Sequence, residues 1–213
     1  PGQGALGRQF RQREPDRLVS MGTLAEAVEV TAGTATAMVK TLAETELVDY
    51  QPRRGVQLTG KGEKIALHVL RRHRMIELFL VDVLGYDWTE VHEEAEVLEH
   101  VISDKLLERI DKLLGHPQVD PHGDPIPAAS GRISRPQLRP LAECDAGPVS
   151  VARITDHAPD FLRFLERSGL TPGAAMTVRA NDELAELITV KPTRGKMIQL
   201  SHSVAKRVLV KGK

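Results

Sequence analysis

The alternation of apolar and polar residues predicts a helix-turn-helix and a hairpin near the start of the chain. Apolar residues recur first at helical spacing and then at alternate positions, in segments separated by turn residues. The predicted elements are, in order, a short helix around 5–12, a helix over 23–28, a turn over 30–33, a helix over 34–45, and strands over 47–51 and 56–58. This order is that of a winged helix-turn-helix domain, with Arg53 and Arg54 at the tip of the wing.

The middle of the chain has helical periodicity. It predicts helices over 62–84, 89–101 and 103–114, with Gly115 ending the third helix. The segment from Asp87 to Glu90 has the pattern of a capping box before the second helix. The apolar stripe of the third helix is larger than such a small layer can bury, which predicts a homodimer interface. The stripe consists of Leu106, Leu107, Ile110, Leu113 and Leu114.

After residue 127 the pattern changes from helical to strand-like. Residues 128–136 are small, basic and without periodicity, as expected of a linker. The predicted elements beyond it are strands over 147–154, 175–180, 187–190, 197–200 and 207–210, with one helix over 159–168. Several short strands separated by turns indicate a small barrel.

Histidine and carboxylate side chains follow one face of each of two predicted helices. At roughly 100° per residue, a helix places the polar group of the second helix in one stripe beside its apolar face. On the preceding helix, His73 and Glu77 share a stripe in the same way. Half-buried carboxylates are unfavourable unless a positive charge neutralises them, which predicts a transition-metal site between the helices. The stripe of the second helix consists of His92, Glu96, Glu99 and His100.

Each polar group alone has a simpler explanation. Histidine and glutamate four residues apart on a helix usually form a surface pair worth about 0.2–0.5 kcal/mol. Two such groups on neighbouring helices favour the metal site instead. Two other classes of protein stay open. A binuclear metalloenzyme would need Glu-x-x-His on two helices, and a metal-independent winged helix would bind only other proteins.

Composition narrows the class further. No apolar run approaches the roughly 18 residues of a membrane span, so we expect no membrane association. The one cysteine, Cys144, excludes an internal disulfide and indicates the reducing cytoplasm. Residues 75–127 hold 3 Lys and Arg against 13 Asp and Glu, whereas both flanking segments are basic. This segregation suits a polyanion-binding part joined to a cation-binding part, although chance segregation gives the same pattern.

The second helix of the helix-turn-helix presents small residues at its start. Small side chains let a helix enter the major groove, where hydroxyls and backbone N–H groups reach phosphates or base edges. Arg53 and Arg54 are expected to meet phosphates or a minor groove. The helix shows no bulky base-reading side chain on its exposed face, so base readout stays unassigned. The residues expected to contact DNA are Thr31, Gly33, Thr34, Thr36, Ala37 and Lys40.

Three motifs resemble the diphtheria-toxin-repressor (DtxR/MntR) family of metal-dependent regulators. They are His73-Arg74-Met75-Ile76-Glu77, Val91-His92-Glu93-Glu94-Ala95-Glu96-Val97-Leu98-Glu99-His100 and Pro121-His122-Gly123-Asp124-Pro125-Ile126-Pro127. Residues 147–213 are more loosely similar to the SH3-like (FeoA-type) domain of that family. The resemblance implies a homodimeric repressor that binds a pseudo-palindromic operator in double-stranded DNA when loaded with Mn(II) or Fe(II). Its expected targets are genes of metal uptake.

The resemblance also implies two metal sites. The residues that match the primary ligands are His73, Glu96, Glu99 and His100. The residues that match an ancillary site are Glu77 and His92, to which some relatives add the segment here occupied by Asp120 and His122. Iron-type members have cysteine at the position of Glu96 and manganese-type members glutamate. A site of nitrogen and oxygen ligands likewise suits Mn(II) best, with Fe(II) as the second candidate.

The sequence departs from the family pattern in two places. Gly4 and Gly7 lie where the first helix of the family normally supplies ligands. Ala158 and Phe161 lie where its barrel does. The nearby side chains that could substitute in the barrel are His157 and Asp160.

We therefore expect a mainly α protein with a small β part. The predicted domains are a winged helix-turn-helix (1–66), a helical dimerisation and metal-binding domain (67–127), a linker (128–140) and an SH3-like FeoA-type barrel (141–213). The expected function is metal-dependent regulation of transcription in the cytoplasm, without enzymatic activity and without a small-molecule substrate. Metal is expected to stabilise one arrangement of the winged helices relative to the dimer core, and DNA to bind that arrangement.

Overall fold

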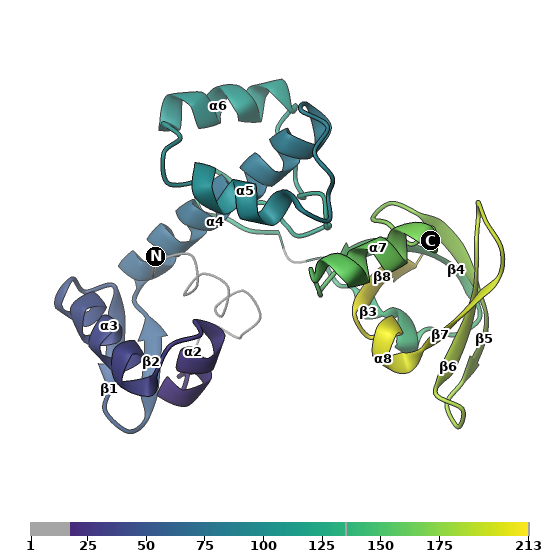
Figure 1. The fold of residues 1–213 in the computed structure, drawn as a ribbon, viewed down its shortest axis with the longest axis horizontal. Coiled ribbons are helices and arrows are strands. Elements are labelled where there is room, and N and C mark those ends of the chain that lie inside the picture. The colour runs from purple at the N-terminus through teal and green to yellow at the C-terminus, as the bar shows by residue number, and fades with distance from the viewer. Residues whose placement is uncertain (1–17, 135, 213) are drawn as a thin grey trace. The chain divides into compact units, whose positions relative to one another are not determined.

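The computed structural model describes residues 18–134 and 136–212 (Figure 1). By internal contacts the described residues form two compact units, one of residues 18–73 with 127–132 and one of residues 74–126 with 133–134 and 136–212. The division falls inside helix α4 (Gly60–Asp82), which belongs to both units. The helix expected around 5–12 lies outside the described residues. None of the helices in the described part is both long enough and apolar enough to cross a membrane.

The first unit is a winged helix-turn-helix. Helices α2 (Met21–Ala27) and α3 (Ala32–Glu44) precede the antiparallel strands β1 (Val48–Gln51) and β2 (Gly55–Leu58). Strand β1 pairs with β2 from Val48 opposite Leu58 to Gln51 opposite Gly55. The core between helices and wing consists of Val19, Leu24, Val39, Val48 and Val56.

Helix α3 begins earlier than the predicted range of 34–45. The Thr31 hydroxyl accepts a hydrogen bond from the Thr34 N–H at 3.2 Å, which caps the helix at Thr31. The turn expected over 30–33 is therefore partly helical. A threonine before an apolar run fits both a turn and an N-cap, and here the cap is formed.

The second unit begins with three packed helices. Helix α4 contacts α5 (Val91–Leu98) through a core of Ile76, Leu80, Val91 and Ala95. On another side, Met75 of α4 packs against Leu107 and Ile110 of α6 (Asp104–Leu113). Adjacent residues of α4 thus serve two different cores, which fixes the rotation of the helix about its axis.

Helix α5 is shorter than the predicted range of 89–101, and the expected capping box is wrong. The Asp87 carboxylate accepts from the Thr89 N–H at 2.8 Å, but the Glu90 side chain makes no cap bond. The Glu90 carboxylate instead forms an ion pair of 2.6 Å with Arg163. Residues 87–90 therefore form a turn that precedes the helix.

The rest of the second unit is a strongly curved six-stranded antiparallel sheet with short helices (Figure 1). Its strands follow the order β3-β8-β4-β5-β6-β7. Strand β3, the 3-10 turn η1 and helix α8 were not predicted, because each is only a few residues long. The elements are β3 (Arg139–Pro140), η1 (Leu141–Glu143), β4 (Gly147–Ile154), α7 (Pro159–Arg167), β5 (Ala175–Asp182), β6 (Leu187–Pro192), β7 (Ile198–Ser201), α8 (His202–Ala205) and β8 (Val208–Gly212).

Gly55 at the start of strand β2 allows a close backbone approach. The φ angle of Gly55 is 141°, and a Cβ there would overlap the carbonyl oxygen of Val19. Val19 exchanges backbone hydrogen bonds with Val56 at 2.8 and 2.9 Å, so the two segments cannot separate without losing these bonds. We expect Gly55→Ala to lower the free energy of unfolding by about 2 kcal/mol or more.

Urea denaturation followed by far-UV circular dichroism measures this change. The control is Gly60→Ala, because a Cβ at Gly60 meets nothing within 4 Å. Equal stabilities of the two variants would contradict the close approach at Gly55.

Candidate metal centre

Helix α4 places three polar side chains in the interior of the protein. His73 is 3 % exposed, Arg74 2 % and Glu77 2 %. Burying charged groups is unfavourable unless partners compensate them. The surroundings of these side chains therefore decide what this part of the protein can bind.

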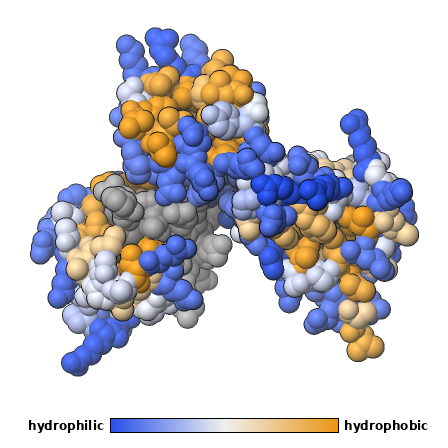
Figure 2. Space-filling view, viewed as in Figure 1, coloured by the Kyte–Doolittle hydropathy of each residue, from blue (hydrophilic) through white to orange (hydrophobic). Residues whose placement is uncertain are grey.

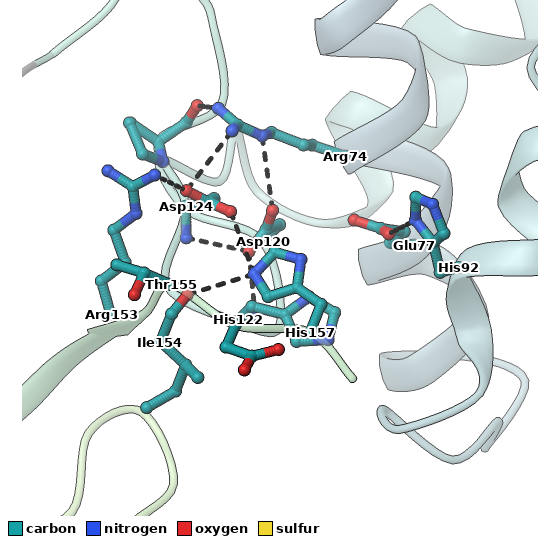
Figure 3. A network of polar contacts seen from close by, with 12 residues as sticks. Arg74, Glu77, His92, Asp120, His122, Asp124, Arg153, Ile154, Thr155 and His157 are labelled. Carbon is teal, nitrogen blue, oxygen red and sulfur yellow. Dashed lines mark hydrogen bonds and ion pairs between the residues drawn. The ribbon is translucent and has the colours of Figure 1, made fainter. Parts of the chain in front are cut away.

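Glu77 is common to two groups of potential metal ligands. One group is His73, Glu77 and His92, and the other is Glu77, Asp120 and His122. In each group the ligand atoms lie within 4.8 Å of one another. The Nδ1 atom of His92 is 3.1 Å from the Oε1 atom of Glu77. Figure 3 shows Glu77 and His92 facing each other from neighbouring helices.

A tight loop presents the other two ligands. One carboxylate oxygen of Asp120 accepts from the N–H groups of His122 and Asp124, both at 2.9 Å. The Asp120 N–H in turn donates to the Asp124 carbonyl at 2.9 Å. This local bonding closes the loop on itself, so that Asp120 and His122 are held on a short, defined turn.

One nitrogen of the His122 imidazole is hydrogen-bonded to the backbone, and the other is buried without such a partner among the described residues. Its Nε2 atom lies 2.9 Å from the Trp88 carbonyl, which can only accept, so Nε2 bears the hydrogen. The Nδ1 atom therefore keeps its lone pair. It is buried and has no hydrogen-bond partner among the described residues. A buried lone pair without a donor is the expected state of a ligand atom before a cation binds.

The pKa values of the two loop residues agree with this arrangement. Burial lowers the pKa of His122 to about 4, so the ring is neutral at physiological pH. Burial, followed by the charges of Asp124 and Glu77, raises the pKa of Asp120 well above its usual range. A divalent cation beside these carboxylates would favour the ionised form of Asp120 and so oppose this shift of its pKa.

Two arginines compensate part of the negative charge. Arg74 lies 3.5 Å from the Asp120 carboxylate and 3.4 Å from the Asp124 carboxylate, and it donates to the Pro125 carbonyl. Arg153 of strand β4 lies 2.5 Å from Asp124. These roles could not be predicted from the sequence, because the partners are far apart in the chain. Arg74 and Asp124 do lie within two of the three motifs that resemble the repressor family.

The other predicted ligands lie at and beyond the end of helix α5. Glu99 is buried, whereas the side chains of Glu96 and His100 are 41 % and 52 % exposed. The Nε2 atom of His92 lies 3.9 Å from Glu96, and that of His100 lies 3.7 Å from Glu99. Among the described residues, no group of three ligands includes Glu96, Glu99 or His100. The first-helix positions Gly4 and Gly7 lie outside the described residues.

Two expectations about individual ligands remain predictions beside this geometry. The resemblance implies that His73 binds metal with Glu96, Glu99 and His100, and in the structure its ligand atom also lies within 4.8 Å of those of Glu77 and His92. The barrel residues His157 and Asp160 belong to neither ligand group. His157 stacks on His122 with 4.3 Å between ring centroids, and Asp160 is an exposed partner of Arg163 at 3.1 Å.

The residues expected to contact DNA lie on the surface of the first unit. Gly33, Ala37 and Lys40 of helix α3 are exposed, as are Arg53 and Arg54 at the wing. The threonine hydroxyls are engaged within the helix. The hydroxyls of Thr31 and Thr34 lie 2.9 Å apart, and that of Thr36 donates to the Ala32 carbonyl at 2.7 Å.

Comparison with known proteins agrees with this architecture. The model of the iron dependent repressor N-terminal DNA binding domain matches residues 10–56. That of the iron dependent repressor metal binding and dimerisation domain matches residues 59–128, and the FeoA domain matches residues 139–212. The combination defines a metal-dependent DNA-binding regulator of transcription.

Individual relatives lead to the same class. The iron-dependent repressor IdeR of Mycobacterium leprae is 32 % identical over 200 residues, which are 88 % of this chain and 86 % of the relative. The diphtheria toxin repressor of Corynebacterium glutamicum is 36 % identical over 121 residues, which are 56 % of this chain and 53 % of the relative. The chain belongs to the iron-dependent repressor family, in which the diphtheria toxin repressor is included.

Solved structures resemble the whole chain. A manganese-dependent transcriptional repressor in complex with manganese is 41 % identical, with a TM-score of 0.88 and full coverage of both chains. The repressor ScaR with bound Cd²⁺ is 33 % identical, with a TM-score of 0.83 and full coverage of both chains. The three-part fold predicted from the sequence is thus confirmed.

Acid should destabilise the metal-free protein through His122. Its folded pKa of about 4 lies below the ordinary value of 6.5, so the unfolded chain binds the proton first as the pH falls. Stability from this group is complete above pH 6.5 and is lost towards pH 4, by about 3 kcal/mol at most. Unfolding of the EDTA-treated protein between pH 7 and pH 4.5 measures the loss.

The effect of His122 is obtained by comparing variants. The variant His122→Phe should lose less stability over this pH range than the parent protein. The variant His116→Gln, which removes an exposed histidine, should behave like the parent. A parallel pH dependence of His122→Phe and the parent would refute a neutral, buried His122.

Proposed function

We propose that the chain is a homodimeric repressor that binds operator DNA when it is loaded with Mn(II). The buried group of Glu77, Asp120 and His122 is the observation that supports this best. Its ligand atoms are oxygen and nitrogen only, which suits Mn(II) and, as the second candidate, Fe(II). The buried cysteine, Cys144, belongs to the core of the barrel. Metal-uptake genes are the expected targets, and the cytoplasm is the expected location.

The ligand groups fit a divalent cation by charge as well as by donor type. Glu77, Asp120 and Asp124 are all buried, and Arg74 and Arg153 lie beside the two aspartates. The lone pair of His122 Nδ1 completes the donor set. We assign Glu77, His92, Asp120 and His122 to one metal region with His73. The second assignment, Glu96, Glu99 and His100, remains the proposal made from the resemblance.

A dimer would cover apolar side chains of the helical part. The exposed side chains include Val97, Val101, Leu106 and Leu113, with exposed fractions from 49 % to 76 %. Figure 2 shows orange, apolar surface over the region that Figure 1 labels α5 and α6. Burial of such a patch against a second copy follows the two-fold symmetry of most homodimers. The winged helix-turn-helix domains of the two protomers would then face a pseudo-palindromic operator.

Metal would act by linkage between its site and the winged helix. Helix α4 begins shortly after strand β2 and includes both His73 and Glu77, so it joins the wing to the ligands covalently. Metal binding at Glu77 then favours one arrangement of the dimer, and DNA binds that arrangement. For the domains we keep the division into residues 1–66, 67–127, 128–140 and 141–213. We propose neither an enzymatic activity nor a small-molecule substrate.

Loss of a ligand should abolish the response to metal. We expect Glu77→Gln, and separately Glu99→Ala, to lose at least tenfold of the Mn(II)-stimulated operator affinity, because each removes a carboxylate ligand. Gel retardation with Mn(II), Fe(II), Zn(II) or EDTA measures the affinity. The control Glu94→Gln removes an exposed carboxylate of helix α5 and should respond like the parent.

Each alternative function has its own outcome in this experiment. Equal operator binding by the parent in Mn(II) and in EDTA would overturn the proposal in favour of a metal-independent module. Metal-stimulated hydrolysis of DNA during the incubation would overturn it in favour of a metalloenzyme.

Charge reversal at the wing should weaken binding to every DNA sequence. We expect Arg53→Glu with Arg54→Glu to reduce the slope of log affinity against log salt by about 4 for the dimer, because each of its two wings has two arginines and each arginine displaces about one counterion. Fluorescence anisotropy at several salt concentrations measures the slope. The control Lys206→Glu changes an exposed charge of the barrel and should leave it unaltered. An unchanged slope in the double variant excludes the wing from phosphate contact.

A further inference from the structure

The charged side chains of the barrel sheet are almost all basic. In the six described strands five charged side chains are basic and one is acidic, and the turn between β6 and β7 adds two basic residues. Figure 1 shows this turn and the turn between β5 and β6 at opposite ends of the sheet. The acidic residue lies at the second of these turns, away from the first. The strand residues are Asp182 against Arg139, Arg153, Arg179, Lys191 and Lys211, and the turn residues are Arg194 and Lys196.

Strand pairing brings Lys211 into line with the turn between β6 and β7. Lys211 of β8 lies opposite Ser150 of β4, and Ser150 lies opposite Ala175 of β5. The Thr193 N–H, directly after β6, donates to the Ala175 carbonyl at 2.9 Å. Three strand spacings of about 4.8 Å therefore separate Lys211 from Thr193, which is roughly 14 Å measured along the sheet.

These residues lie on the outer face of the sheet. Side chains alternate between the two faces of a strand, and the neighbours of Lys191, Ser150 and Lys211 belong to the buried core. Lys191 lies opposite Thr177 of β5, which also has buried neighbours on both sides. Lys191 therefore faces the same side as Lys211. The core neighbours include Val149, Val151, Val190 and Val210, each at most 6 % exposed.

We call Lys191, Arg194, Lys196 and Lys211 the basic face. No ion pair between residues of the described ranges includes a member of this basic face, whereas Arg153, Arg163 and Arg207 of the same barrel each form one of 2.5 or 2.6 Å. Lys191 donates to the Gly195 carbonyl at 2.5 Å, which holds its charge at the turn without neutralising it. Positive charges that are gathered without carboxylates attract a polyanion.

We propose that the basic face binds phosphate groups of the DNA to which the winged helices are bound. The inference rests on the proposed function and adds a second DNA contact to it. DNA is the polyanion that this family binds, and the barrel is joined to the DNA-binding domain by one chain, so its contact is intramolecular once the winged helix is bound. A face of roughly 14 Å spans about four base pairs at 3.4 Å each.

Hydroxyl groups beside the lysines suit the same partner. Ser150 and Thr177 point outward next to Lys211 and Lys191, and serine and threonine commonly contact phosphate oxygens together with lysine and arginine. Helix α3 itself has one basic residue, Lys40. The barrel would therefore add affinity without sequence preference, because phosphates carry no sequence information.

The salt dependence of DNA binding by the full chain tests the basic face. The neutral variant combines Arg194→Gln, Lys196→Gln and Lys211→Gln. We expect it to reduce the slope of log affinity against log salt by about 5 for the dimer, because each of six phosphate contacts contributes about 0.9. A reduction below about 2, which is less than one contact per protomer, overturns the proposal.

Fluorescence anisotropy in Mn(II) measures this slope. The probe is a duplex that the parent protein selects from a random-sequence library in Mn(II), extended by about two helical turns on each side so that the barrel has DNA to reach.

Matched variants separate charge from structure. The charge-preserving variant combines Arg194→Lys, Lys196→Arg and Lys211→Arg and should keep the slope of the parent. Lys206→Gln removes an exposed charge outside the basic face and should also keep it. If the charge-preserving variant loses as much slope as the neutral one, the effect is structural and the proposal is wrong. If circular dichroism shows the neutral variant unfolded, Lys211→Gln alone decides, with an expected reduction of about 2 for the dimer.

Two further outcomes tell the levels of the argument apart. If the parent binds DNA in response to Mn(II) while the neutral variant keeps its slope, the proposed function stands and the inference about the barrel is wrong. If the parent shows no Mn(II)-dependent binding, the proposed function is wrong and this inference falls with it.

A membrane surface is the rival partner for the basic face. Vesicles of phosphatidylcholine with phosphatidylserine provide the probe, because anionic lipids also attract clustered lysine and arginine. Vesicle binding that the neutral variant loses, together with an unchanged DNA slope, would assign the basic face to a membrane and overturn the proposal.

Discussion

The burial of three carboxylates in one place is the constraint on which the second unit depends. Glu77, Asp120 and Asp124 are each at most 4 % exposed, and two arginines lie against them. Removing charges from water is unfavourable, so the positions of these carboxylates depend on the positive groups around them. Burial and the neighbouring carboxylates raise the pKa of Asp120, and the proposed metal ion would act in the opposite direction.

This constraint explains why helix α4 and the barrel are connected through side chains that are not themselves ligands. Arg74 comes from the helix and Arg153 from strand β4, and both approach Asp124. The loop between them is too short to have a core of its own. Its order comes from hydrogen bonds of the Asp120 carboxylate and from contact with the barrel. The ligands on the loop are thus placed by elements far away in the sequence.

The ligand candidates on each helix could be predicted from the sequence, but the distant partners that hold the loop could not. Histidines and carboxylates at helical spacing predicted the ligand candidates, because one helix face is a property of a few neighbouring residues. The partners of Asp124 could not be predicted, since an ion pair between a loop and a strand leaves no periodic pattern. For the same reason the stacking of His157 on His122 could not be predicted. The resemblance assigned His73 to the primary ligands, and its helical spacing from Glu77 accounts for its place near Glu77 and His92.

The loop of Asp120 and His122 approaches strand β4 so closely at Gly123 that a Cβ there would overlap the Ala152 carbonyl. This close approach has a consequence for recombination between relatives. The absent side chain, the carboxylate next to it and the guanidinium of Arg153 form one fitted surface. Exchanging the barrel of this protein for that of a distant homologue would bring a foreign strand against this loop. Such a chimera needs the glycine, the aspartate and the arginine to be inherited together, so these three positions form one unit of exchange.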